Sequence, residues 1–359
     1  MTTAVDKTPE SATRPEGRGV AISVIIPARN EEQFLAECLE SLCRLDFPRE
    51  SFEVILVDNG STDRTLEIAA QFKSSLGLRI LQKTGVPISA LRNLGAAAAR
   101  GDVFAFLDAD CRVPPSWLRD ATELLRAHGV GVIGAEPLLP ENVTWVSRAW
   151  LGRRPVEKRG EVTYVGTANF IVSRENFLRV GGFDESLETN EDCEFCHRIH
   201  EAGLSVLAFP QIAIVHLRVP RTLADFYRKQ KWHGTHVFKV FLREISALTN
   251  ARAVFFALYT LLCLAGIVCG GLFALATHRF GLLAAAVAAM LLPSVLLAAQ
   301  AAMARKSWAD WGPLTLLYLT YGFARAVCIF NIRAWFAAVR PVPGTREARS
   351  SARAQTPAP

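Results

Sequence analysis

The stretch VFAFLDAD, residues 103–110, indicates the fold class of this protein. Its five apolar residues in a row are typical of a strand that is buried on both faces, and two aspartates follow directly. A similar apolar run at residues 54–57 ends at Asp58. Between these runs lie segments with apolar residues at helical spacing. The pattern predicts an α/β domain in which helices cover both faces of a mostly parallel sheet.

The expected elements follow from the same two periodicities. Strands are predicted at residues 24–26, 54–57, 78–81, 103–107, 163–172, 206–209 and 212–215, and helices from about Glu31, after Asp63, over 91–98 and over 191–202. Residues 135–159 contain Pro, Trp and Arg without a clear period, and we expect them to form a mobile loop or lid.

Aspartates follow two of the predicted strands at the point where each strand ends. Ligands of such sheets bind beyond the carboxyl ends of the strands, so Asp58, Asp108 and Asp110 are expected to converge on one edge. Two carboxylates separated by one residue can face a divalent cation, and Mg²⁺ and Mn²⁺ prefer such oxygen ligands. The simpler alternative for residues 108–110 is a solvated acidic turn.

The charge of the chain is unevenly distributed. The 359 residues carry a formal charge of +6, but the region from Ala251 onward contributes +8 and the first 250 residues contribute −2. A basic nucleic-acid surface on the α/β part is therefore not indicated. The eight cysteines show no small-domain spacing and are expected to be reduced thiols. Residues 1–18 lack the apolar stretch of a signal peptide.

Two uncharged runs of 25 residues, 253–277 and 280–304, follow the α/β part. About 20 apolar residues are enough to cross a bilayer, so these runs predict a transmembrane hairpin. A third run, 311–330, contains Arg325. Because positive charge favours the cytoplasmic side, we prefer two spans and an interfacial or re-entrant third helix over three spans. A buried helix pair of a soluble protein is the alternative for the hairpin.

Short motifs that run along residues 21 to about 240 resemble family 2 glycosyltransferases of the GT-A fold. The family transfers a sugar from a nucleotide diphosphate donor with inversion at the anomeric carbon. The motifs are SVIIPARNEE (23–32), VDNGSTD (57–63), RNLG (92–95), DAD (108–110), GTANF (166–170), GGFD (181–184) and Glu191-Asp192.

The resemblance implies a role for each matching residue. Asp58 matches the acid that holds the base, usually uracil, although Asn59 stands where many members have a second Asp. Asp192 matches the general base, which takes a proton from the acceptor hydroxyl. The implied sets are Pro27, Asn30, Glu31, Asp58, Arg92 and Asp108 for the donor, Asp108, Asp110 and His216 for a Mn²⁺ or Mg²⁺ ion, Asp192 for catalysis, and Gly166, Asn169, Glu191 and Trp232 for the acceptor.

The expected organisation has five parts. They are a disordered tail (1–19), a nucleotide-sugar-binding half (20–128), an acceptor-binding half with a juxtamembrane helix (129–250), membrane helices (251–335) and a disordered basic tail (336–359). We expect a multi-pass protein of the inner (cytoplasmic) membrane with its catalytic domain in the cytoplasm. Its expected partners are a nucleotide-sugar donor, with a UDP-sugar as the first choice, and a lipid or lipid-linked saccharide acceptor. GDP-mannose is the second choice of donor, and no nucleic-acid partner is expected.

Other readings of the same residues remain open. Cys193, Cys196 and His197 fit a c-type haem pattern and, with His200, one helical face of a zinc site, but four ligands along one helix are too far apart for one ion. Inward packing of Phe195 and Ile199 is the preferred interpretation. The basic-aromatic segment 228–233 fits a lipid-facing helix or an acceptor clamp equally well. His216 is alternatively an ordinary loop histidine. The whole protein is alternatively an inactive nucleotide-sugar-binding protein or a nucleotidyltransferase.

Overall fold

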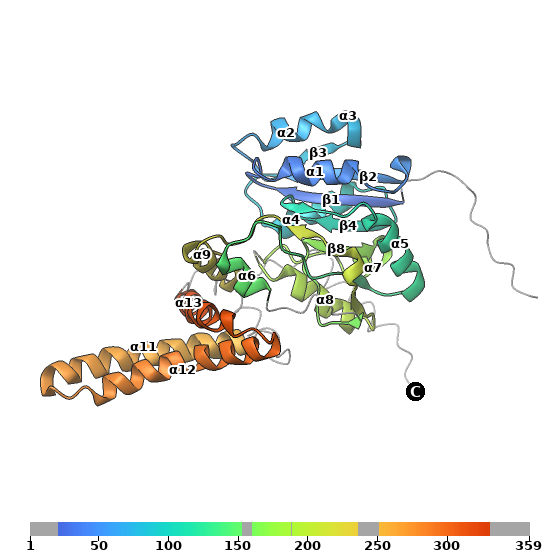
Figure 1. Cartoon of the computed structure of the whole chain (residues 1–359). Helices are drawn as coiled ribbons and strands as arrows, with labels where there is room; N and C mark the ends of the chain where they lie inside the picture. The colour runs from blue at the N-terminus through green and yellow to red at the C-terminus, as the bar shows by residue number, and fades with distance from the viewer. Residues whose placement is uncertain (1–20, 153–159, 188, 236–250, 331–359) are drawn as a thin grey trace, which may run out of the picture.

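The computed structural model describes residues 21–152, 160–187, 189–235 and 251–330. An eight-stranded sheet with the order β3-β2-β1-β4-β8-β6-β9-β7 forms its centre (Figure 1). Strands β3, β2, β1 and β4 are parallel, whereas β8 joins β4 in the antiparallel direction. The strands are β1 (Ile22–Ala28), β2 (Phe52–Asp58), β3 (Arg79–Gln82), β4 (Val103–Leu107), β6 (Val132–Gly134), β7 (Gly160–Glu161), β8 (Asn169–Ser173) and β9 (Val206–Ala208). The expected mostly parallel α/β sheet is confirmed.

Helices cover both faces of this sheet because its central strands are apolar on both sides. Every residue of β1 and β2 is buried. Leu35 and Trp117 belong to the core on one face, and Leu91, Phe177 and Phe195 belong to the core on the other. The helices of this part are α1 (Leu35–Cys43), α2 (Thr65–Gln71), α3 (Lys73–Leu76), α4 (Ile88–Ala98), α5 (Trp117–His128), α6 (Trp145–Leu151), α7 (Arg174–Arg179), α8 (Glu191–Glu201) and α9 (Leu223–Gly234), with short 3₁₀ turns η1 (Arg49–Ser51) and η2 (Pro210–Ile212).

Three predicted boundaries differ from the structure. The first helix begins at Leu35 rather than near Glu31, because the backbone N–H of Glu31 donates to Thr65 Oγ1 in the next loop. The strand expected from residue 163 begins at Asn169, whose N–H closes a turn with the Gly166 carbonyl. The strand expected at 212–215 is shortened to β10 (Val215–His216), which pairs with β5 (Cys111–Arg112) in a separate two-stranded sheet.

The stretch expected to be a mobile loop contains helix α6. Its Val146, Ala149 and Trp150 are buried against Phe226 of α9 and Leu314 of the C-terminal helices. The prediction failed here because the apolar face of α6 packs on helices far away in the sequence. Residues 153–159 of the same stretch lie outside the described residues.

A cluster of phenylalanines holds α8 against the sheet. The ring of Phe195 on α8 stacks with that of Phe177 at 5.6 Å and lies 4.9 Å from that of Phe183. Ile199 is also fully buried, so the expected inward packing of this helix is confirmed. The packing fixes the N-terminal end of α8, which carries Glu191 and Asp192, beside the carboxyl end of β4.

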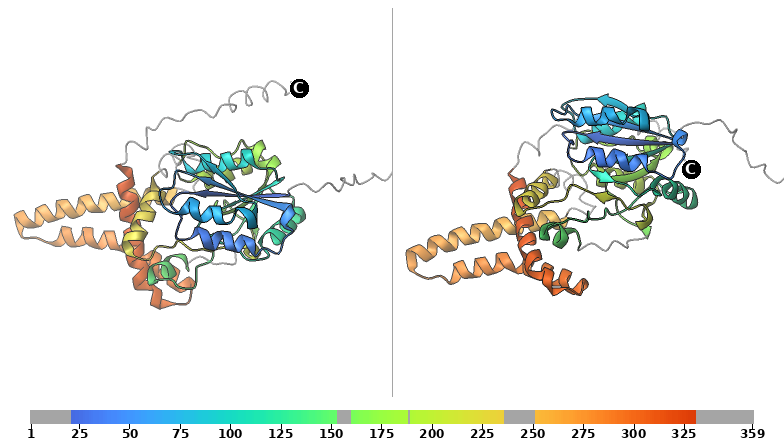
Figure 2. Two further views of the ribbon diagram at one scale, coloured as in Figure 1. Left: turned by 90° about the horizontal axis from the view of Figure 1, so that it is seen from above. Right: turned by 45° about the horizontal axis from the view of Figure 1, so that its top comes forward.

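Three long apolar helices follow the α/β part, namely α11 (Ala251–Thr277), α12 (Gly281–Ala304) and α13 (Trp311–Ile329), with the turn η3 (Trp308–Asp310) before the last. All three segments are long and apolar enough to cross a membrane. Helices α11 and α12 form an antiparallel hairpin that extends away from the sheet (Figure 2). Helix α13 runs across the base of this hairpin and packs against α9 and α6 (Figure 2). The predicted tails 1–19 and 336–359 lie outside the described residues.

Candidate active site

A buried arginine joins two elements that carry acidic motifs. Arg92 on α4 is 1% exposed, and its Nη2 donates to Asp108 Oδ1 at 2.8 Å while its Nη1 donates to Glu191 Oε1 at 2.7 Å. The Thr167 hydroxyl donates to the same Glu191 oxygen at 3.1 Å. Burial alone would lower the pKa of Arg92, but Asp108 and Glu191 outweigh it and raise this pKa above its ordinary value. Arg92 therefore positions two carboxylates.

Asp192, the predicted base, follows Glu191 in the first turn of α8. Its Oδ1 accepts the backbone N–H of Cys193 at 2.8 Å, and Gly166 lies beside its other oxygen. Burial, together with the charge of Glu191, raises the pKa of Asp192 to about 7. This carboxylate therefore exchanges a proton near neutral pH, as a general base should.

Asn190 directly precedes α8, but its side chain does not cap the helix. Its backbone is left-handed, with φ of 66°, and its amide donates to Thr189 Oγ1 instead. Asparagine tolerates this conformation better than most residues. The turn directs the chain into α8 at the site.

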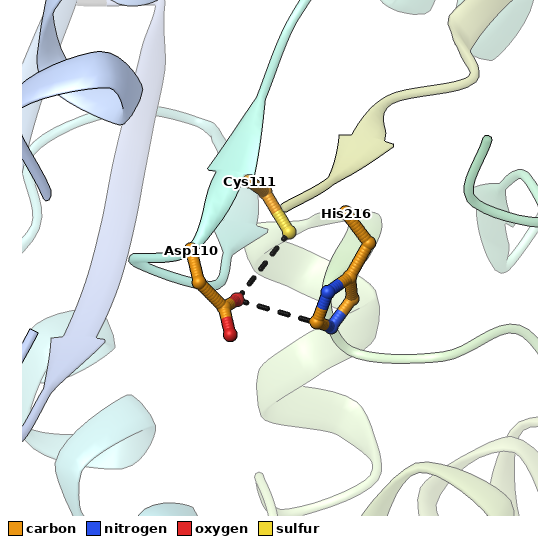
Figure 3. A group of neighbouring side chains, drawn as sticks. All are labelled: Asp110, Cys111 and His216. Carbon is orange, nitrogen blue, oxygen red and sulfur yellow. Dashed lines mark hydrogen bonds and ion pairs between the residues drawn. The ribbon is translucent and has the colours of Figure 1, made fainter. Parts of the chain in front are cut away.

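Asp110 lies at the centre of a possible metal site (Figure 3). Its Oδ1 is 3.8 Å from His216 Nε2 and 3.7 Å from Cys111 Sγ. The ladder between β5 and β10 pairs His216 with Cys111, which brings the predicted histidine to the predicted aspartate. The fold thus brings Asp110 and His216 together, with Cys111 as the third member of the group.

The chemistry of these groups fits a hard divalent cation. Burial lowers the pKa of His216, so its imidazole is neutral, and its Nδ1 has no hydrogen-bond partner among the described residues. Burial and Asp110 raise the pKa of the Cys111 thiol well above its usual range, so it stays protonated. A carboxylate and a neutral imidazole suit Mn²⁺, whereas a protonated thiol is a poor ligand.

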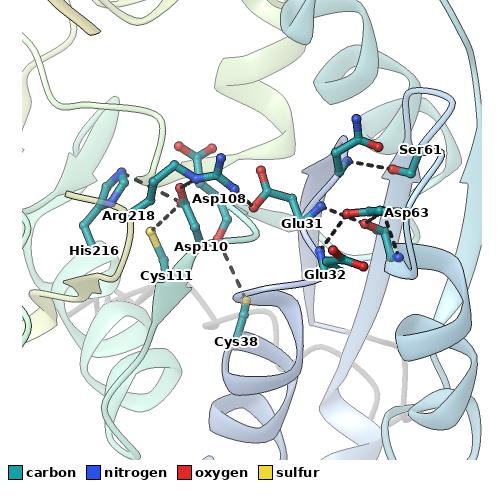
Figure 4. Close-up of polar contacts among 12 residues, drawn as sticks. Glu31, Glu32, Cys38, Ser61, Asp63, Asp108, Asp110, Cys111, His216 and Arg218 are labelled. Carbon is teal, nitrogen blue, oxygen red and sulfur yellow. Dashed lines mark hydrogen bonds and ion pairs between the residues drawn. The ribbon is translucent and has the colours of Figure 1, made fainter. Parts of the chain in front are cut away.

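Arg218 is a site residue that the sequence analysis missed (Figure 4). Its Nε donates to Asp110 Oδ2 at 3.1 Å, and its Nη2 pairs with Glu31 Oε2. Burial and the charge of Asp110 raise the pKa of Glu31 to about 7, although Arg218 opposes this shift. The signal in the sequence was position: Arg218 follows His216 by two residues, at the end of the strand that reaches the site.

Lys229 on α9 is a second cation near the same carboxylates. Burial lowers the pKa of Lys229, and the charges of Asp110 and Asp108 act in the opposite direction. In the sequence, Lys229 is recognisable only as part of the basic-aromatic segment 228–233. The structure shows that one side of α9 is turned toward the site.

Two loops at the expected nucleotide side are joined by hydrogen bonds (Figure 4). The N–H of Asn30 donates to Ser61 Oγ at 2.9 Å, and the N–H of Thr62 donates to Asn30 Oδ1 at 2.8 Å. Asp58 is fully buried and accepts the N–H groups of Gly60 and Ser61, which shapes its own turn. Pro27 lies within the buried strand β1. The sheet order brings Asp58, two strands away from Asp108, to the same edge.

The predicted acceptor residues differ in their accessibility. Asn169 is 1% exposed, and its amide accepts from Trp117 Nε1 and donates to the Ile212 carbonyl, so it has a structural role. Trp232 on α9 is 51% exposed. All eight cysteines are free thiols, as expected.

Comparisons with known proteins identify the family. The profile of Glycosyl transferase family 2 matches residues 23–180, and that of Glycosyl transferase family group 2 matches residues 103–319, which is more than half of the chain. The chain belongs to the family 2 glycosyltransferases. The expected family is confirmed.

Three relatives of this family 2 glycosyltransferase bear on its architecture. It is 29% identical over 239 residues to the glycosyltransferase AglE of Haloferax volcanii, which covers 65% of this chain and 78% of AglE. It is 25% identical over 229 residues to the beta-monoglucosyldiacylglycerol synthase of a Nostoc strain, covering 59% of this chain and about half (48%) of the synthase. The structure of the mannosyltransferase PcManGT from Pyrobaculum calidifontis, solved with GDP-Man and Mn²⁺, matches with a TM-score of 0.57 at 21% identity, over 89% of this chain and 90% of PcManGT. The GT-A fold and its continuation into C-terminal helices are thus confirmed.

Proposed function

We propose that this protein is a membrane-anchored inverting glycosyltransferase. In this proposal it transfers a sugar from a nucleoside diphosphate sugar to a lipid or lipid-linked saccharide. The observation that supports the proposal is the chain of contacts from Asp108 through Arg92 to Glu191, the residue that precedes Asp192.

Asp192 is the group that would move the proton. Its anion takes the proton of the acceptor hydroxyl while the hydroxyl oxygen attacks the anomeric carbon and the bond to the diphosphate breaks. Attack on the face opposite to the leaving group inverts the configuration. Arg92 and Thr167 fix Glu191, and thereby the first turn of α8, so that the base is oriented before the acceptor arrives.

Asp108, Asp110 and His216 would hold a Mn²⁺ or Mg²⁺ ion. Such an ion, when bound, stabilises the negative charge that develops on the diphosphate leaving group. Arg218 balances the charges of Asp110 and Glu31 in this structure. In this proposal Arg218 and Lys229, two cations near the motif, bind donor phosphates as well.

The donor is expected to be a UDP-sugar, and GDP-mannose remains the alternative. The joined loops of Asn30 and Ser61 and the turn at Asp58 form the expected nucleoside side. PcManGT was solved with GDP-Man, which supports testing both nucleotides. Thermal stabilisation by each nucleotide sugar, with and without Mn²⁺, would rank them, because a ligand that binds the native state raises its stability.

The acceptor is proposed to be a lipid because the apolar helices lie next to the catalytic domain. The name of the Nostoc relative describes synthesis of a glucosyl diacylglycerol. We further propose that α11 and α12 cross the cytoplasmic membrane, that α13 lies at its surface, and that the catalytic domain faces the cytoplasm. The position of α13 across the base of the hairpin and against α9 supports this arrangement.

The decisive experiment compares Asp192→Asn with the parent protein in an assay that detects the released nucleoside diphosphate. We expect a loss of transfer of about 10²–10⁴-fold, which is the usual contribution of a positioned base. Donor binding, followed by thermal stabilisation, should be nearly unchanged because Asn has the same size.

Glu201→Gln on the same helix is the matched control, since Glu201 is exposed and its carboxylate pairs with His197 on the same helix. It should leave transfer intact. Equal turnover in Asp192→Asn and the parent would reject Asp192 as the base. Release of pyrophosphate instead of a nucleoside diphosphate would identify a nucleotidyltransferase.

A further inference from the structure

Arg325 on α13 is a buried cation that the proposed chemistry does not use. It is 9% exposed and lies where α13 packs on α9. Its Nη2 makes a long hydrogen bond of 3.4 Å to Gln230 Oε1, and its guanidinium lies 4.9 Å from the centre of the Tyr321 ring. Its Nε and Nη1 have no hydrogen-bond partner among the described residues. A buried charge with two unpaired donors is costly, so a counter-charge is expected at this place.

Where helix α9 approaches Arg325 most closely, it offers a glycine and no side chain that could pair with the guanidinium. Gly234 faces it, and a Cβ at Gly234 would lie 3.1 Å from Arg325 Nη1 and 2.6 Å from Cys328 Sγ. Arg325 has no ion pair with a carboxylate among the described residues. The missing partner therefore fits an anion that comes from outside this part of the chain.

We propose that Arg325 binds the phosphate group of a membrane lipid. A guanidinium offers two parallel N–H groups to a phosphate, which is a stronger and more specific contact than a single charge. Arg325 belongs to α13, and α13 with α9 lies at the base of the apolar hairpin (Figure 2). With the hairpin in a bilayer, which is the part of the proposed function on which this inference rests, the lipid phosphates lie at this level.

The position of the site links it to the carboxylates. Gln230, the partner of Arg325, directly follows Lys229, whose ammonium lies in the field of Asp108 and Asp110. Helix α9 therefore separates the phosphate site from the acidic site, and a helix is about 10 Å across. A lipid held by its phosphate at Arg325 would have its polar end within reach of the sugar donor.

The test measures lipid binding by the full-length protein in a neutral detergent with native mass spectrometry. The probes are phosphatidic acid, diacylglycerol and inorganic phosphate. We expect the parent to retain phosphatidic acid but not diacylglycerol, and Arg325→Gln to bind phosphatidic acid about tenfold more weakly or worse. Arg279→Gln at the exposed far end of the hairpin removes the same charge and should bind like the parent.

Arg325→Lys keeps the charge but not the paired donors, and it is expected to bind at an intermediate level even if Arg325→Gln folds poorly. Equal binding by Arg325→Gln and the parent, or an equal loss in Arg279→Gln, would overturn the proposal. Inorganic phosphate that competes as well as the lipid would show a site for free phosphate and would also overturn it. Nucleotide-sugar binding, measured in the same samples, reports separately on the proposed function.

Discussion

Burial determines the acidity of single side chains at the acidic site more than the residue type does. Asp192 and Glu31 are ordinary carboxylic acids, but desolvation and a neighbouring carboxylate raise the pKa of each to about 7. The sequence could place Asp192 beside Glu191 and thus suggest a base. It could not show that Arg92, 99 residues before Glu191, would fix the pair through a buried contact.

The pKa of Asp192 predicts how activity depends on pH. A raised pKa keeps the carboxyl protonated, and therefore inactive as a base, below about pH 7. We expect kcat/KM to fall about tenfold for each pH unit below 7 and to level off above it. This fall of activity is the acidic limb of the pH profile. The groups facing Asp192 determine its position, because Glu191 raises the pKa of Asp192 and Arg92 lowers it. Initial rates at saturating Mn²⁺ over pH 5–9 would measure it.

Glu31→Gln distinguishes the two acids that titrate near neutral pH. The acidic limb should persist in this variant if Asp192 is responsible, even when the donor KM changes. Residual activity of Asp192→Asn should lack the limb. A limb that disappears with Glu31→Gln alone would assign the titration to Glu31.

At the scale of elements, the periodicity of apolar residues predicted the elements that pack against their neighbours in sequence. It missed those that pack against segments far away in the sequence. The five-residue apolar run of β4 was placed correctly because every residue in it is apolar on both faces. Helix α6 was not predicted, since its apolar face is covered by α9 and α13 rather than by its neighbours in sequence. The start of α1 was displaced for the same reason: the loop before it bonds to the following βα loop.

The RNLG motif shows how an element is positioned for the site. Asn93 bonds both the N–H and the carbonyl of Phe183, and thereby fixes the turn that leads toward α8. A Cβ at Gly95 would lie 2.4 Å from Ile25 Cγ2, so α4 lies unusually close to β1. The glycine therefore sets the depth at which Arg92, on the same helix, enters the core.

Replacement of Gly95 by Val is expected to destabilise the protein by about 1–3 kcal/mol, because the added methyl groups overpack a filled core. Thermal or denaturant unfolding of the full-length protein in detergent would measure the change.

Ala97→Val on the exposed side of α4 is the matched control, and helix propensity alone limits its effect to about 0.7 kcal/mol. Ile25→Ala combined with Gly95→Val should be less destabilised than the two single changes added together. Strict additivity would show that the close approach to Ile25 is not the cause.

At the scale of the whole molecule, the described part has three layers. The α/β domain lies on one side, the apolar hairpin extends on the other, and α6, α9, η3 and α13 form the layer between them (Figures 1 and 2). The four exposed tryptophans among the described residues all belong to this middle layer, namely Trp145, Trp232, Trp308 and Trp311. Tryptophan is enriched where a membrane meets water, so this layer is the expected membrane surface. Sequence alone left two and three spans open, because length and apolarity do not show that α13 crosses the hairpin.

The layered arrangement predicts which residues share a side of the membrane. In sealed vesicles, a membrane-impermeant maleimide would label one introduced cysteine at a time, namely His278→Cys, Ala309→Cys or Phe330→Cys, each at an exposed position. The background carries Cys43→Ser and Cys269→Ser, since these two native cysteines are exposed. If α13 lies along the surface, positions 309 and 330 react from one side and 278 reacts only from the other.

Three spans would instead group 330 with 278, because a crossing helix separates its two ends. Equal reaction of all three positions from one side would mean that the hairpin does not cross the bilayer, and the apolar helices would then need a protein partner to cover them.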